Sequence, residues 1–366
     1  MLSKRSPVSL YITIIIGLIL SFIFLKTNNI NFDLIPYIAS VKKIENSAIS
    51  VTTLQRDTYD ALKSEVSGEA FARATDSSIK FRVNMQDDSA VFAKNLPYYG
   101  IKTGYNYFNA ALKFGTSSYT KAIAANSAVF WLLTLVLTFL YLKKLIRSNW
   151  WLVILSFLIC LNPHFIYGAR IATPDMMSCF VVLFAFVSVT QLKLNQAYIL
   201  GLLAIIVRPD NIVFSGLLGL FIFLNMTDRK VKISSAIYML LCLATVFILI
   251  PQSGNSGNIS SLYQGNYLKL LAVNISAAIN ETFVPFMLLL AVLGFALGYL
   301  KLYNPEGRWV ILCLVIVGVK FMLVPSLENR LYLPFYLILV LNFTKAIVQN
   351  SHLSKVLNKK AIIRRL

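Results

Sequence analysis

The chain has 366 residues, of which 57% are hydrophobic and only 13% are charged. Soluble domains average about 45–50% apolar and about 25% charged residues, so this composition argues against a water-soluble fold. The formal net charge is +19, but the positions of the cations along the chain explain it without a nucleic-acid partner.

Apolar runs recur along the whole sequence and predict an all-α polytopic membrane protein, a single integral membrane domain over residues 1–366 with about ten transmembrane helices. The first run follows Lys4 and Arg5 and lacks a small-x-small cleavage site, so we expect an uncleaved signal anchor. In chain order, the expected spans are residues 7–25, 125–142, 150–161, 176–190, 197–207, 212–224, 233–250, 283–300, 309–324 and 331–347.

Three segments lie outside the expected spans. Residues 26–126 form a long first loop whose aromatic cluster around Tyr98 and Tyr99 argues against disorder, and we expect amphipathic helices there that lie on the membrane. Residues 251–281 form a second loop, interpreted as a lid or a re-entrant element. Residues 348–366 form a basic tail, which either orients the chain or lies on anionic headgroups.

The cations follow the positive-inside rule if both ends of the chain are cytoplasmic. The segments then assigned to the inside contain most of the lysines and arginines, and their acidic residues are only Asp228 and Glu306. Both long loops are then extracytoplasmic. Since no organelle signal is present, we expect a multi-pass protein of a bacterial inner membrane.

Cysteine chemistry is not indicated by this sequence. Cys160, Cys179, Cys242 and Cys313 all lie in apolar runs without CxxC spacing, which is typical of ordinary packing. No metal site is predicted, and the requirement for a divalent cation or another cofactor stays unknown.

Ionisable residues gather at the outer ends of the expected spans, where they predict a cleft that opens to the outside. Placing a charge at membrane depth is unfavourable unless the charge is paired or hydrated, so such positions are informative. In chain order the candidates are Asp33 with Tyr37, His164 with Arg170, Asp175, Arg208 with Asp210, and Glu328 with Arg330.

Structural interpretations compete with this one. Arg208 with Asp210, and Glu328 with Arg330, are equally well explained as local ion pairs, and His164 as a structural hydrogen-bonding group. Asp175 follows Thr173 and Pro174, which favours a helix cap. Asp33 is either a cap or a general base.

At these residues the chain resembles the GT-C superfamily of membrane glycosyltransferases, which includes protein O-mannosyltransferases and aminoarabinose transferases acting on lipid A. The segment Asp33-Leu34-Ile35-Pro36-Tyr37 is similar to the acidic site after the first span of that superfamily. Many members have two adjacent acids there, whereas Leu34 follows Asp33; Asp87 and Asp88 are candidates for the missing partner. The segment 96–102, which ends in Lys102, and the sequences Thr173-Pro174-Asp175 and Arg208-Pro209-Asp210 resemble further loop motifs.

The resemblance implies transfer of a sugar from a polyprenyl-phosphate donor to a glycan, lipid or protein acceptor at the membrane. Asp33 would then accept the proton of the acceptor hydroxyl. Lys102, Arg208 or Arg330 would stabilise the departing lipid phosphate, and single displacement would invert the anomeric centre.

Three other classes of membrane protein compete with a glycosyltransferase. O-antigen polymerases and ligases also use outer-face arginines, but their large loop usually falls late in the chain. A transporter or flippase should show internal repeats and acids near mid-membrane, and neither is evident. A purely structural subunit would not require charges from five outward segments.

Overall fold

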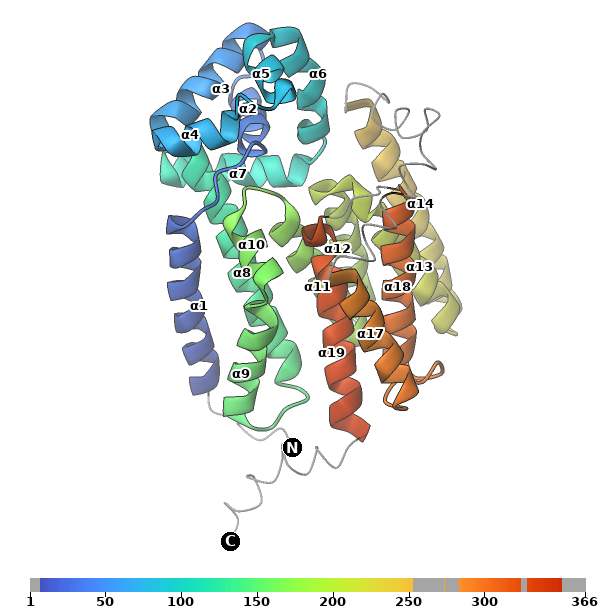
Figure 1. Ribbon diagram of the computed structural model, residues 1–366. Helices are drawn as coiled ribbons and strands as arrows, with labels where there is room; N and C mark the ends of the chain where they lie inside the picture. Colours follow the sequence, from blue (N-terminus) through green and yellow to red (C-terminus); the bar gives the residue numbers. More distant parts are fainter. Residues whose placement is uncertain (1–6, 253–272, 274–282, 324–327, 351–366) are drawn as a thin grey trace.

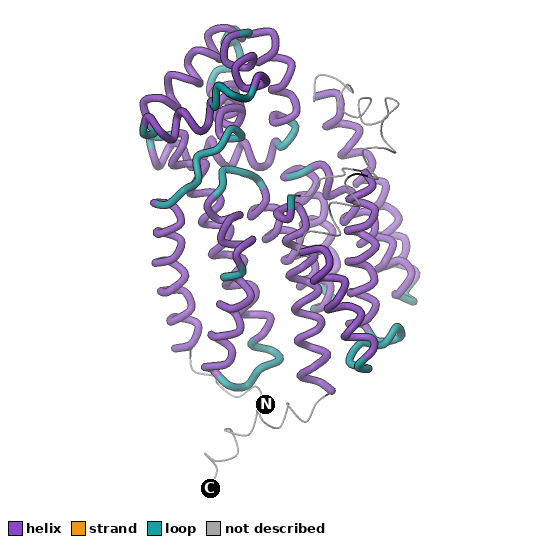
Figure 2. Tube along the Cα trace, in the orientation of Figure 1, coloured by secondary structure: helices purple, strands orange, loops and turns teal. Residues whose placement is uncertain are grey.

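The structure is a computed structural model that describes residues 7–252, 273, 283–323 and 328–350 (Figure 1). Over this part of the chain it is all-helical, with 17 α-helices and two short 3-10 helices. Figure 2 shows short loops between most helices of the bundle. The expected second loop, 251–281, and the basic tail, 348–366, lie largely outside the described residues.

Among the described helices, four are long and apolar enough to cross a membrane. Crossing about 30 Å of hydrocarbon takes about 20 helical residues, and these segments approach or exceed that length. They are α1 (Val8–Lys26), α8 (Tyr119–Leu142), the Arg229–Leu249 part of α14 (Arg229–Gln252), and Asn329–Gln349, which joins η2 (Asn329–Tyr332) to α19 (Leu333–Asn350).

The expectation of about ten spans is therefore wrong. The run at 150–161 becomes α9 (Asn149–Cys160), which breaks before Pro163 and continues after a 66° bend as α10 (Pro163–Arg170), so at most this pair adds a fifth span. Other apolar runs form helices of 14 to 16 residues, which reach only about 21–24 Å at 1.5 Å per residue. The remaining helices of the bundle are α11 (Asp175–Thr190), α12 (Leu194–Val207), η1 (Pro209–Asn211), α13 (Ile212–Asn225), α17 (Phe283–Ala296) and α18 (Pro305–Leu323).

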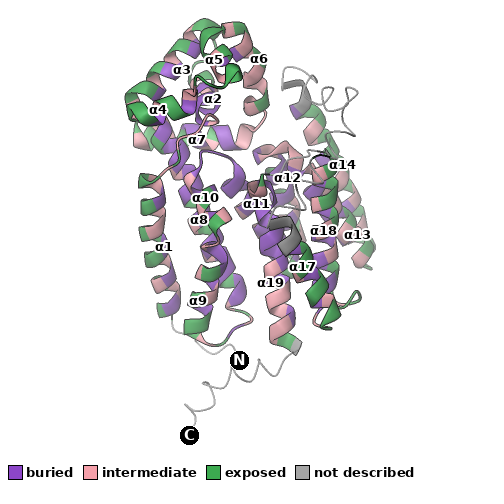
Figure 3. Cartoon of the chain, in the orientation of Figure 1, coloured by how far each residue is buried: buried purple, intermediate pink, exposed green. Residues whose placement is uncertain are grey.

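The outer faces of the long helices are apolar, as a lipid environment allows. On α1 the side chains of Tyr11, Leu18 and Phe22 are all more than half exposed, and so are those of Leu240 and Phe247 on α14. Figure 3 shows exposed positions along α1 and over α3 (Val51–Glu65) and α4 (Gly68–Thr75), which lie outside the bundle. In water such apolar faces would be unfavourable, whereas lipid chains contact them without penalty.

Residues 27–118 fold into a compact helical cap at one end of the bundle (Figure 1). They were expected to be separate helices lying on the membrane, but α2 is instead the core of the cap, because Leu34, Tyr37 and Ile38 are almost fully buried. The cap helices are α2 (Leu34–Glu45), α3 (Val51–Glu65), α4 (Gly68–Thr75), α5 (Lys80–Asp87), α6 (Ser89–Gly100) and α7 (Thr103–Thr116). Three other cap helices, α3, α6 and α7, pack against α2.

Helix α7 joins the cap to the bundle. It packs along α8 and also against the end of α12, and Gly104 makes the second contact close: a Cβ there would lie 3.1 Å from Ile206 Cγ2. On its free face Tyr107 and Phe114 are strongly exposed. This spacing of seven residues puts two aromatic rings on one side of the helix, as in the interfacial helix expected for this segment.

Glu65 ties α3 to the first turn of α8. Its carboxylate accepts hydrogen bonds from Ser118 Oγ at 2.7 Å and from the backbone N–H groups of Tyr119 and Thr120 at 3.1 and 2.8 Å. Helix N-termini stabilise negative charge. Burial raises the pKa of Glu65, but these hydrogen bonds outweigh burial and leave the pKa below its ordinary value.

Substituting Glu65→Ala should destabilise the protein by about 1 kcal/mol, as expected for a lost helix cap. Because the folded state holds Glu65 at a lowered pKa, its contribution is complete above the pKa of the unfolded chain and is lost as the pH falls through the folded value. Thermal unfolding in detergent at neutral and acidic pH measures this, with the difference between wild type and variant shrinking in acid. Glu69→Ala, on exposed α4, is the matched control.

Candidate functional site

The buried carboxylate of Asp175 joins two arginines from distant parts of the chain. Its side chain is only 1% exposed. Oδ1 accepts a hydrogen bond from Arg208 Nη1, Oδ2 lies 3.4 Å from Arg330 Nε, and Thr173 Oγ1 donates to Oδ2 at 2.7 Å. These contacts connect the start of α11, the end of α12 and the turn η2.

Asp210 forms a second centre beside the first. Its carboxylate pairs with Arg208 Nε at 3.0 Å and with Lys320 Nζ at 2.9 Å. Lys320 is almost completely buried, with 3% of its side chain exposed, and it also donates to the carbonyl of Leu331 at 3.2 Å. The Lys320 ammonium, on α18, therefore has one partner in η1 and one in η2.

Asp33, the residue before α2, lies where the cap meets this cluster. One oxygen is 3.3 Å from Arg330 Nη2, and the other accepts from the Tyr99 hydroxyl at 3.1 Å. Asn31 Nδ2 donates to the carboxylate at 3.2 Å. Arg330 also pairs with Glu328, whose side chain is 54% exposed, at 2.8 Å.

Lys102 stands between the cap and the cluster, surrounded by three tyrosines. Its ammonium is 4.5, 4.8 and 5.2 Å from the ring centroids of Tyr98, Tyr99 and Tyr37, all within the range of cation–π attraction. It donates to the Tyr37 hydroxyl at 2.8 Å. Burial, and then the nearby Arg208, lower the pKa of Lys102 to about 7, while burial and then Asp33 raise the pKa of Tyr37 well above its ordinary value.

Local backbone signals position these groups at helix ends. Pro209 begins the 3-10 turn η1, so α12 stops at Val207 and Arg208 takes an extended conformation. Pro174 is the N-cap residue of α11, and no side chain caps this helix. The expected capping role of Thr173 or Asp175 is therefore wrong, because their side chains bond to each other and to the arginines.

Eight residues singled out from the sequence meet in this cluster. The two local pairs, Arg208 with Asp210 and Glu328 with Arg330, do form, but both arginines also make long-range ion pairs. Asp33 occupies the N-cap position of α2, yet its carboxylate does not cap the helix. The residues brought together are Asp33, Tyr37, Lys102, Asp175, Arg208, Asp210, Glu328 and Arg330.

Other predicted site residues have different surroundings. Asp88 caps α6 by accepting from the backbone N–H of Ala90 at 2.8 Å, and the contacts of Asp33 are with Arg330, Tyr99 and Asn31 instead of a second acid. Arg170 donates to the carbonyl of Thr27 at 2.9 Å, which ties α10 to the end of α1. His164 lies in the first turn of α10, where its backbone N–H donates to Asn162.

Sequence reasoning did not assign Lys320 to the site. The signal was present, because this lysine interrupts the apolar run 309–324, and a lone cation in such a run points to a partner. Tyr99 belongs to the aromatic cluster and to the segment 96–102 of the sequence analysis, but it was not expected to contact Asp33. Its contact with Asp33 joins residues 66 positions apart, which no local pattern predicts.

Chemically, the cluster sets a partly exposed carboxylate, Asp33, beside two guanidinium groups and an ammonium of lowered pKa. Nη1 of Arg330 is buried and has no hydrogen-bond partner among the described residues. The same part of the chain contains no group of three or more His, Cys, Asp or Glu placed to hold a metal ion. The arrangement suits an anion beside a proton-accepting group.

The chain matches no protein-family model, no curated protein and no solved structure. Its function is therefore argued from the site itself.

Replacing Asp175 with Asn should destabilise the protein by about 3–5 kcal/mol, since it leaves two nearly buried arginines without their shared counterion. Thermal unfolding in detergent measures the loss. Asp87→Asn, at an exposed position in the cap, is the control and should stay within about 0.5 kcal/mol of wild type. Equal stability of both variants would show that Asp175 does not hold the arginines together.

Lys102 should give the protein a characteristic pH dependence. An unfolded lysine has a pKa of about 10.4, so between that value and the folded pKa of about 7 the unfolded chain binds one more proton. Stability therefore rises with pH over this interval. Melting temperatures of wild type and Lys102→Met should diverge in favour of wild type from pH 7 to 9, whereas Lys94→Met, on the exposed face of α6, should follow wild type.

Proposed function

We propose that this chain is a membrane glycosyltransferase that moves a sugar from a polyprenyl-phosphate donor to a hydroxyl group of a glycan, lipid or protein acceptor. The observation that supports the proposal best is the 3.3 Å contact between Asp33 and Arg330 in a cluster that also contains Arg208. Such a transfer needs a proton acceptor next to cations that stabilise a leaving phosphate.

The motifs behind the GT-C resemblance meet in this cluster. Asp33, Asp175 and Arg208 come from three separate motifs, and Arg330 contacts both carboxylates. Lys102, from the fourth motif, lies beside Tyr37 and Tyr99. Residues that resemble one superfamily in sequence and gather in space support one shared site more strongly than any single motif does.

In the proposed reaction the acceptor oxygen attacks the anomeric carbon of the donor sugar while the bond from that carbon to the phosphate oxygen breaks. The acceptor proton passes to the carboxylate of Asp33. The bonding electrons leave with the polyprenyl phosphate, whose negative charge Arg330, Arg208 and protonated Lys102 stabilise. One displacement inverts the anomeric centre.

An anion can reach Arg330 if Glu328 moves. The Glu328 carboxylate is the most exposed member of the cluster and pairs with the same guanidinium at 2.8 Å. A phosphate is a bidentate partner for arginine, as a carboxylate is. Glu328 thus holds the place of the donor phosphate in the free protein and turns outward when the donor binds.

We also propose that the protein is a multi-pass protein of a bacterial inner membrane, with the cap on the extracytoplasmic side. The α8–α9, α13–α14 and α17–α18 connections lie at the end of the bundle opposite the cap (Figure 1). These connections and the helix ends next to them are rich in cations, as the cytoplasmic side requires. The cations are Lys143, Lys144, Arg147, Arg229, Lys230, Lys232, Lys301 and Arg308.

The proposal is tested by supplying purified protein with radiolabelled polyprenyl-phosphate sugars and candidate acceptors. Asp33→Asn should reduce the transfer rate by roughly 10²–10⁴-fold, the usual contribution of a general base. Asp60→Asn, on the exposed surface of α3, is the matched control and should transfer at the wild-type rate.

Equal transfer by wild type and Asp33→Asn would remove Asp33 from the role of base. If wild type transferred sugar from none of the monosaccharide donors but joined undecaprenyl-linked glycans, the chain would belong with the polymerases or ligases instead.

A further inference from the structure

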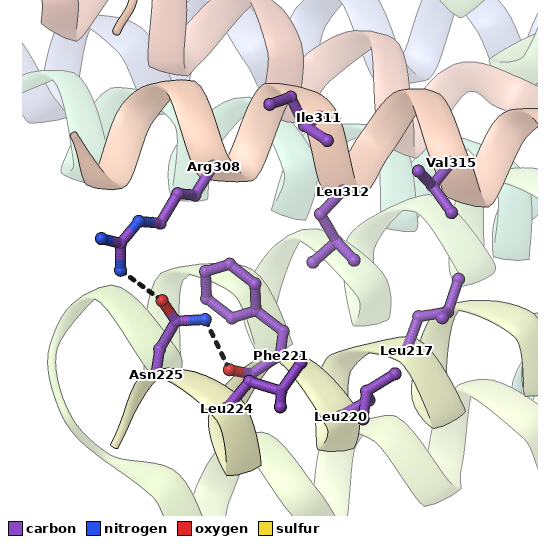
Figure 4. A pocket seen from close by; sticks show the side chains of 9 residues that line it. All are labelled: Leu217, Leu220, Phe221, Leu224, Asn225, Arg308, Ile311, Leu312 and Val315. Atoms are coloured by element: carbon purple, nitrogen blue, oxygen red, sulfur yellow. Dashed lines mark hydrogen bonds between the residues drawn. The ribbon is translucent and has the colours of Figure 1, made fainter. Parts of the chain in front are cut away.

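A second feature lies at the other end of the bundle, far from the ion cluster. Helices α13 and α18 border an apolar groove of about 240 Å³, with Asn225 and Arg308 at one end (Figure 4). Arg308 precedes Lys320 by twelve residues on α18, which corresponds to about 18 Å along the helix axis. The groove is therefore separate from the proposed transferase site.

The groove opens away from the bundle. Of the side chains that line it, Leu220, Leu224 and Val315 have exposed fractions of 40%, 67% and 44%. Among the residues that the structure describes, Arg308 is the only charged one that lines it. Within a membrane this surface faces lipid, and a hydrocarbon chain is the occupant that fills such a groove without leaving polar groups unpaired.

The polar end of the groove is ordered by Asn225. Its Oδ1 accepts a hydrogen bond from Arg308 Nη1, and its Nδ2 donates to the carbonyl of Phe221 at 2.8 Å, as the dashed lines in Figure 4 show. Arg308 is exposed, and no carboxylate among the described residues forms an ion pair with it. Its remaining guanidinium donors therefore face the surface at the end of the groove.

The surrounding charge is positive and is not neutralised by the nearby acids. Asp228 accepts from the backbone N–H of Lys230 at 2.8 Å, so it caps α14, and Glu306 pairs with Lys345 at 2.6 Å. Arg229, Lys230 and Lys232 open α14 next to α13. A negatively charged group at this end would meet several cations at once.

We propose that the groove binds one anionic phospholipid, with an acyl chain between α13 and α18 and the headgroup phosphate on Arg308. Arginine binds phosphate through two parallel N–H···O bonds, and the neighbouring lysines favour a lipid with net negative charge over a zwitterionic one. The occupant is a lipid such as phosphatidylglycerol from the leaflet on the side opposite the cap. This site does not depend on the proposed transferase activity.

Native mass spectrometry of the purified full chain tests the proposal, with dioleoyl phosphatidylglycerol and dioleoyl phosphatidylcholine titrated separately. Wild type should retain one phosphatidylglycerol about tenfold more tightly than phosphatidylcholine, because both lipids offer a phosphate but only phosphatidylcholine carries a choline cation that the neighbouring lysines repel. Arg308→Gln should weaken the retention of both lipids about tenfold, since each phosphate loses its hydrogen bonds to a charged group. Val315→Trp, which fills the groove, should weaken both lipids. Arg147→Gln, an exposed arginine between α8 and α9, is the matched control.

Three outcomes would overturn the proposal. Equal retention of the two lipids by wild type would exclude recognition of the headgroup. A loss in Arg147→Gln as large as in Arg308→Gln would mean diffuse attraction to a basic surface. A lipid-free dimer that Val315→Trp dissociates would mean that a second copy of the chain covers the groove. Arg308→Lys, which keeps the charge but not the paired geometry, should retain both lipids with an affinity between those of wild type and Arg308→Gln.

Discussion

The carboxylate of Asp175, buried between the guanidinium groups of Arg208 and Arg330, is the interaction on which the organisation of the site depends. Two arginines this close would repel each other at low dielectric, and one buried carboxylate would be equally unfavourable alone. Together they fix the turns η1 and η2 against the start of α11. Arg330 is then held where its Nη2 lies 3.3 Å from the carboxylate of Asp33 in the cap, so the same interaction joins the two parts of the fold.

The cap supplies several side chains of the site. Its buried helix α2 begins at Asp33 and presents Tyr37 one turn later, and α6 and α7 bring Tyr99 and Lys102 to the same place. Because burial and then the nearby Arg208 lower the pKa of Lys102, its charge is less strongly held than that of an ordinary lysine. The site therefore combines fixed arginine charges from the bundle with one titratable charge from the cap.

The two proposals use opposite ends of the same helices. The ion cluster lies at the start of α13 and near the end of α18, and the groove lies at the end of α13 and the start of α18. A helix with charged groups at both ends and an apolar middle is the pattern that a membrane imposes. The residues that face lipid and those that face the cluster can consequently be altered separately.

The sequence by itself determined the helical class, the presence of helices long and apolar enough to span a membrane, and most members of the cluster, because apolar runs, prolines and charges at helix ends are local signals. It did not determine the number of spans, since a run of apolar residues does not show where Pro163 bends a helix or where a helix of 14 residues ends. The sequence suggested Asp88 as an acidic partner of Asp33 and Asp175 as a helix cap, whereas in the structure Asp88 caps α6 and Asp175 binds arginines. Contacts such as Asp33 with Arg330 join residues nearly 300 positions apart. Such pairing is a property of the whole packed structure, because it depends on how α2, α11 and η2 meet in space.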